Sequence, residues 1–65
     1  MELVKGTVVP YRNNDELPPS VRHSLPPRAQ DIYREAFNHA FEIHADEPRQ
    51  EELAHRIAWA AVKRS

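Results

Sequence analysis

The chain has 65 residues and no cysteine, so we expect one small domain without disulfide bonds or thiolate metal ligands. Nine basic and ten acidic residues give a net charge of -1, so the overall charge does not indicate a nucleic-acid-binding protein. The apolar runs are too short to cross a bilayer and no signal peptide is recognisable. A cytoplasmic protein without direct membrane insertion is therefore expected.

The first ten residues form a segment that is richer in β-branched residues than the rest of the chain. Three valines and a threonine surround Gly6, the only glycine. Glycine reaches positive φ without steric cost, so Gly6 suits the turn of a short hairpin between Leu3–Lys5 and Thr7–Val9. A lone hairpin is hardly stable in water and would have to pack on helices, and a frayed tail is the alternative. Residues 1–10 are thus predicted to be a β-rich segment that precedes a helical domain over residues 11–65.

Three helices are predicted in this helical domain. Proline suits the first turn of a helix, where its missing N–H is not needed, and it pushes the preceding residue out of the helical region. Two Leu-Pro-Pro phrases, beginning at Leu17 and Leu25, therefore each begin a helix. Asp46 or Glu47 is expected to cap the third helix, with Pro48 at its first position. The predicted helices span residues 18–24, 27–45 and 48–64.

Apolar residues recur at three- and four-residue steps in both long helices, a spacing that lines one face of a helix. The aromatic residues Tyr33, Phe37 and Trp59 lie in these stripes, so we expect them to pack in the core rather than to stack on nucleic-acid bases. His55 lies beside a stripe and one turn from Trp59, which favours a packing or capping role over metal binding. The predicted core consists of Val21, Leu25, Ile32, Tyr33, Ala36, Phe37, Phe41, Leu53, Ile57, Ala58, Trp59 and Ala61.

A dense, ordered set of short motifs runs from Pro10 to Lys63. The motifs are Pro10-Tyr11, Leu17-Pro18, Ser20-Val21, Leu25-Pro26, Ala29-Gln30-Asp31-Ile32-Tyr33, Glu35-Ala36-Phe37-Asn38, Glu52, Ala54-His55 and Ala58-Trp59-Ala60-Ala61-Val62-Lys63. Together they resemble the ChaB family, which is named for a proposed regulator of a bacterial cation/proton antiporter. The resemblance implies three helices and a small sheet, and some related sequences are suspected of binding DNA. The predicted fold is therefore mainly α: a three-helix ChaB-like domain with a small β-hairpin at the N-terminus.

The sequence departs from the family pattern in two places. The acidic loop between the long helices, linked in the family to weak binding of divalent cations, is short here and spans residues 45–50. Family members usually continue beyond the last helix into a basic, aromatic strand, whereas this chain ends at Ser65. We expect the β-rich N-terminal segment to supply a strand in its place.

Acidic residues around the short loop are the candidates for metal binding. Calcium takes about six to eight oxygen ligands, usually from a loop that contains glycine. Asp46, Glu47 and Glu51 offer carboxylates without a glycine, so any calcium or magnesium should be held weakly. A solvated charged turn is the alternative.

Five basic residues are the candidate contacts for a nucleic acid or another partner. They are Arg22 and Arg28 near the Pro-rich corner, and Arg56, Lys63 and Arg64 on the last helix. If the two groups converge in space, they form a patch suited to phosphate groups. Ordinary surface charge is the alternative.

No catalytic or cofactor-binding motif is recognisable, so the sequence predicts a non-enzymatic binding module that needs no cofactor. Three functions remain open. By resemblance the chain regulates a cation/proton antiporter; alternatively its basic face binds nucleic acid, or it is a small protein-interaction or host-modulating module. A protein is the expected partner, with nucleic acid and weakly bound divalent cations as further candidates.

Overall fold

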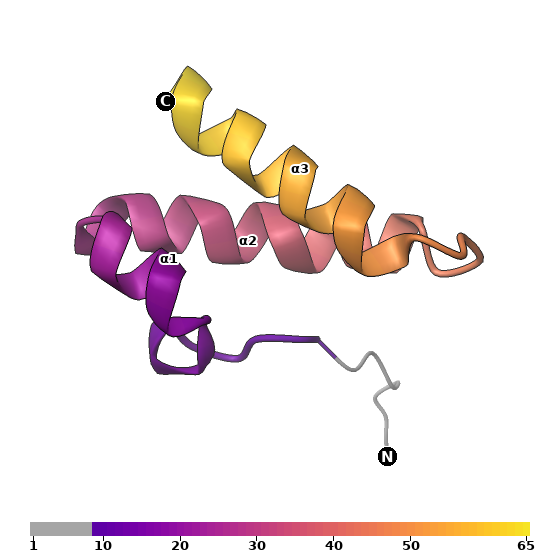
Figure 1. Ribbon diagram of the computed structural model, residues 1–65, viewed down its shortest axis with the longest axis horizontal. Helices are drawn as coiled ribbons and strands as arrows, with labels where there is room; N and C mark the ends of the chain where they lie inside the picture. The colour runs from indigo at the N-terminus through magenta and orange to yellow at the C-terminus, as the bar shows by residue number, and fades with distance from the viewer. Residues whose placement is uncertain (1–8) are drawn as a thin grey trace, which may run out of the picture.

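The computed structural model describes residues 9–65, and within this range the chain is mainly helical (Figure 1). A 3-10 helix η2 spans Asn14–Glu16, and three α-helices follow it: α1 (Pro19–Ser24), α2 (Pro27–Ile43) and α3 (Gln50–Arg64). The predicted three-helix architecture is confirmed. No strand occurs in residues 9–65, so the predicted hairpin is not supported where it includes Val9. The rest of the predicted hairpin lies outside the described residues.

The first two helices begin where the prolines predict. Pro19 and Pro27 occupy the first position of α1 and α2, where the missing N–H leaves no hydrogen bond unmade. The short helix α1 also needs partners for the carbonyls at its C-terminal end. The side-chain amide of Gln30 supplies them, because its Nε2 donates to the Leu25 oxygen at 2.9 Å and to the Arg22 oxygen at 3.2 Å. One side chain of α2 therefore fixes the corner between α1 and α2.

The connection between α2 and α3 is longer than predicted. Helix α2 ends at Ile43 rather than at residue 45, and α3 begins at Gln50 rather than at Pro48. Nε2 of Gln50 donates to the Phe41 oxygen at 2.7 Å, which satisfies a carbonyl in the last turn of α2. The prediction that Asp46 or Glu47 caps α3 is wrong, because the cap position is Arg49 and no side chain makes a capping hydrogen bond there.

Helices α2 and α3 form an antiparallel pair, and α3 crosses α2 obliquely so that its C-terminal end rises away from α2 (Figure 1). Three alanines are buried in this pair: Ala40 on α2 and Ala54 and Ala58 on α3. Small side chains at these positions allow the two helix backbones to approach closely. Leu17, directly after η2, and Val21 on α1 add to the same core. No helix in residues 9–65 is long and apolar enough to cross a membrane.

The observed core agrees with the predicted core only in part. Of the predicted residues, Val21, Tyr33, Phe37 and Ala58 are buried, and Leu25, Ala36, Phe41 and Trp59 pack against them while partly exposed. The prediction is wrong for Ile57, which is 40% exposed. Ala54 and Ala58, four residues apart, carry the buried face of α3, so Ile57 falls to the side of that contact. The predicted core also omitted three buried residues: Leu17, Ala40 and Ala54.

Candidate functional site

The segment before η2 is attached to α2 by main-chain atoms. The amide N–H of Tyr11 donates to Oδ1 of Asn38 at 3.2 Å, and Nδ2 of Asn38 donates back to the Tyr11 carbonyl oxygen at 2.7 Å. One α2 side chain therefore satisfies both polar groups of residue 11, as a neighbouring β-strand would. This two-way contact fixes the position of Tyr11.

A second set of contacts holds η2 against the same helix. Nδ2 of Asn14 donates to Oδ1 of Asp31 at 2.7 Å, and Nε of Arg34 donates to Oδ1 of Asn14 at 2.8 Å. Both side-chain groups of Asn14 are thus bonded to α2. The Tyr11 ring also packs against Phe37, with ring centroids 5.0 Å apart. The segment between Tyr11 and η2 is therefore held at both ends.

Helices α2 and α3 are joined by a hydrogen bond between Tyr33 and His55. The Tyr33 hydroxyl and Nδ1 of His55 lie 2.7 Å apart, and Trp59 packs edge-on against the Tyr33 ring at 5.6 Å. The predicted packing role of His55 is thus confirmed, although the side chain is exposed. Burial raises the pKa of Tyr33 to about 12, with a smaller contribution from Tyr11, because a buried phenolate loses its hydration. The hydroxyl therefore stays protonated over the physiological range.

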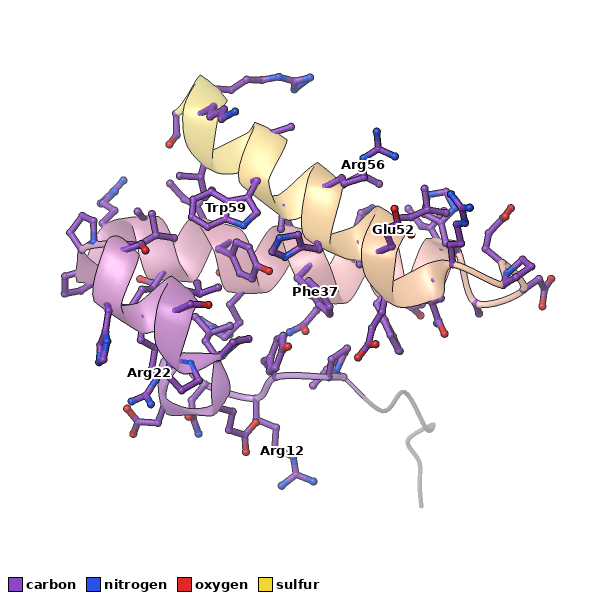
Figure 2. The ribbon with its side chains drawn as sticks, viewed as in Figure 1. Arg12, Arg22, Phe37, Glu52, Arg56 and Trp59 are labelled. Atoms are coloured by element: carbon purple, nitrogen blue, oxygen red, sulfur yellow. The ribbon has the colours of Figure 1, made fainter. Side chains whose placement is uncertain are left out.

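These residues border a pocket of about 360 Å³ that is open to solvent beside the α2–α3 pair. Aromatic side chains form much of its wall, and two adjacent carboxylates, Glu51 and Glu52, line it from the first turn of α3. Figure 2 shows Phe37 on α2 and Glu52 near the beginning of α3. Burial, and then the negative charge of Glu51, raise the pKa of Tyr11. The pocket is lined by Tyr11, Pro18, Tyr33, Phe37, Glu51, Glu52 and His55.

The basic residues singled out from the sequence are exposed and distributed over all three helices. Arg22 lies on α1 and Arg56 on α3, and Figure 2 shows them on opposite sides of the α2–α3 pair. Nε of Arg22 also donates to the Leu17 oxygen at 3.2 Å, which ties this side chain to the main chain between η2 and α1. Lys63 and Arg64 lie in the last turn of α3.

Arg28, in the first turn of α2, has acidic neighbours. It lines a second hollow of about 230 Å³ together with Asp31, Ile32 and Glu35. Two carboxylates beside a guanidinium oppose the approach of a phosphate.

The acidic residues singled out as metal ligands do not form a cluster. Asp46 and Glu47 are exposed in the turn after α2, whereas Glu51 lines the pocket. Within residues 9–65, no group of three or more His, Asp or Glu side chains is arranged to hold a metal ion. The structure therefore gives the predicted divalent-cation site no support.

The sequence prediction missed the pocket itself. Tyr11 lies just before η2, and nothing in its local sequence shows that it meets Phe37, many residues later. A signal was nevertheless present, because Pro10-Tyr11, Asn38 and His55 all belong to the motifs that carry the family resemblance. Motif residues far apart in the sequence are candidates for contact in the fold.

Comparisons with known proteins agree on one family. The family model described as ChaB matches residues 17–65. The chain is 51% identical, over 61 residues, to the protein named "Putative cation transport regulator ChaB" of Escherichia coli strain K12; the match covers 85% of this chain and 80% of that protein. The protein of the same name from Shigella flexneri has the same identity and coverage. No solved structure matches the chain significantly.

Proposed function

Because the chain belongs to the ChaB family, we propose that it is a non-enzymatic binding module that regulates a cation/proton antiporter from the cytoplasm through contact with a protein partner. Its relatives carry the name of a cation transport regulator. A regulator of this kind needs a surface that recognises another protein, and the pocket beside α2 and α3 is the surface that best fits this task.

The proposal is carried by one observation: the polar side chains that hold the fold together are different from those that line the pocket. Gln30, Asn14 and Asn38 make hydrogen bonds that hold α1, η2 and the N-terminal segment in place. Glu51 and Glu52 are exposed and line the pocket instead. Walls that are already fixed lose little conformational entropy on binding, and this favours recognition of a partner.

The proposal predicts that the protein changes the exchange rate of a cation/proton antiporter from the same organism, reconstituted in proteoliposomes. Allosteric coupling of ordinary strength changes an equilibrium about fivefold or more, so a change of that order is expected at saturating protein. Dye-reported proton flux measures it, and Phe37→Ala protein, which is expected not to fold because it lacks a buried core ring, serves as the unfolded negative control. Unchanged flux at saturating protein would contradict the proposal.

Nucleic-acid binding by the exposed basic residues is the second candidate function. One observation favours it: no carboxylate in residues 9–65 lies within ion-pairing distance of the five candidate side chains. They are Arg22, Arg28, Arg56, Lys63 and Arg64. Their spread over three helices and the acidic neighbours of Arg28 oppose it. For this reason it ranks second.

If nucleic-acid binding is the function, the protein should bind duplex DNA weakly and with little sequence preference. Its affinity for DNA should fall steeply as the salt concentration increases, because binding releases counterions from the DNA. The double variant Arg28→Glu with Lys63→Glu should then abolish binding, since both side chains are exposed and the fold does not need them. Arg12→Glu with Arg49→Glu, an equal change of charge at other exposed positions, is the matched control. A salt titration by fluorescence anisotropy measures all three proteins. Absence of binding by the wild type at low salt, or equal binding by all three, would eliminate this function.

A further inference from the structure

We propose that the pocket beside α2 and α3 receives the side chain of a single arginine or lysine from a protein partner. The inference deepens the proposed function, and it rests on that function for the statement that the occupant belongs to a protein. Its own support is the juxtaposition of two exposed carboxylates, Glu51 and Glu52, with the partly exposed ring of Tyr11 in one open pocket.

The charge of the pocket selects a cation. Glu51 and Glu52 both line it, and among residues 9–65 no lysine or arginine does. Arg49 approaches Glu52 at 3.9 Å, but the two side chains are 75% and 56% exposed. An ion pair so exposed to water contributes little and competes weakly with another cation. An anionic ligand would meet both carboxylates and be repelled.

The aromatic walls select a cation that carries an apolar stem. Tyr11, Tyr33 and Phe37 all line the pocket, but Tyr33 and Phe37 are only 1% and 3% exposed. The accessible aromatic surface is therefore that of Tyr11, which is partly exposed and whose ring centroid lies 5.0 Å from that of Phe37. Aromatic faces attract a guanidinium or an ammonium group and also bury methylene groups. The cavity of about 360 Å³ lies within the usual range for ligand pockets, about 300–1,000 Å³. A long basic side chain satisfies both kinds of wall at once.

A bare metal ion fits this pocket less well. Divalent ions need several oxygen ligands at short distance, whereas only two carboxylate residues of the described range 9–65 line the pocket. A purely apolar ligand would strip water from the carboxylates without replacing their hydrogen bonds.

The helix dipole offers a simpler reason for acidic residues in the first turn of α3. That reason accounts for Glu51 and Glu52 on the helix but does not account for the aromatic cavity beside them. The charge of Glu51 also raises the pKa of Tyr11, so its field reaches the aromatic wall. The carboxylates and the aromatic wall therefore belong to the same pocket.

The test uses the full chain and a short blocked peptide with one arginine between glycine and serine residues. Its matched probe carries citrulline in place of arginine, which keeps the shape but removes the charge. We expect the arginine peptide to give saturable amide shifts centred on Tyr11, Phe37 and Glu51 in NMR spectra. The citrulline peptide should bind about tenfold more weakly or not at all.

Two matched double variants test whether the charges of the pocket bind the arginine peptide. Glu51→Gln with Glu52→Gln should weaken the arginine peptide about tenfold, because it removes both charges of the pocket while keeping the side-chain volumes. Glu35→Gln with Glu42→Gln removes two exposed charges from α2 outside this pocket and should leave the affinity unchanged. A lack of saturable shifts, equal binding of both peptides, or equal weakening in both variants would overturn the inference.

These outcomes are separate from those of the antiporter experiment. Arginine-selective binding without any change in proton flux would leave the pocket inference standing and would refute the proposed function. A change in proton flux without arginine-selective binding would support the proposed function and would refute the pocket inference.

Discussion

Phe37→Ala is expected to abolish cooperative folding. Phe37 is 3% exposed, and its ring packs against three others. The distances between ring centroids are 5.0 Å to Tyr11, 5.9 Å to Tyr33 and 5.9 Å to Phe41. Truncating a buried phenylalanine to alanine costs about 3–5 kcal/mol, through lost burial and the cavity left behind. A domain this small has a total stability of only about that size. Thermal melting followed by circular dichroism should therefore show no cooperative transition in this variant.

Ile57→Ala is the matched control for that result. The apolar stripe of the sequence places Ile57 in the core, but the side chain is 40% exposed, so its truncation should cost less than about 1.5 kcal/mol. An Ile57 variant that still melts cooperatively, beside a Phe37 variant that does not, would confirm the observed core. Equal losses in the two variants would contradict it.

Alkaline pH is expected to destabilise the fold through Tyr33. The pKa of this hydroxyl is raised from 10.0 to about 12, chiefly by burial, so in this range the folded state holds a proton that the unfolded chain releases. The contribution of Tyr33 is thus fully present below pH 10 and is lost as pH rises toward about 12. A shift of about two pKa units corresponds to a loss of about 2–3 kcal/mol. Urea unfolding at a series of pH values measures it.

Tyr33→Phe separates this effect from the deprotonation of lysine side chains. The variant removes the titrating hydroxyl and its hydrogen bond to His55. Its stability should be slightly lower at neutral pH, because His55 is exposed and water can replace the lost partner. Its stability should also fall less steeply above pH 10, with a residual slope from Tyr11, whose pKa is raised too. Identical slopes in the two proteins would show that Tyr33 does not control the alkaline transition.

The helices could be predicted from the sequence because their signals are local. Pro19 and Pro27 fix where α1 and α2 begin through the restricted φ of proline, which needs no knowledge of the rest of the fold. The boundaries of the α2–α3 connection could not be predicted in the same way. They depend on a hydrogen bond between Gln50 and the Phe41 carbonyl, which exists only after the two helices have packed.

The depth of burial within each stripe was harder to predict than the stripe itself. Periodicity shows which residues share a face but not how closely another helix approaches that face. Here the close approach is made by Ala54 and Ala58, so the larger Ile57 is displaced to the side. The pocket was out of reach for a related reason, because Tyr11 meets Phe37 only through the contact of its main chain with Asn38.

The bond pattern of Asn38 has an evolutionary consequence. Within residues 9–65, the Asn38 side chain bonds to the main-chain N–H and carbonyl of residue 11, a pair of groups that every amino acid except proline carries. The side chain of residue 11 can therefore be exchanged for another that still covers Phe37. The exchange would not weaken the hydrogen bonds that attach the segment before η2 to α2. Attachment and selectivity are thus encoded by different atoms of a single residue. Descendants of this sequence can acquire a new binding preference there by one substitution while the helical scaffold stays the same.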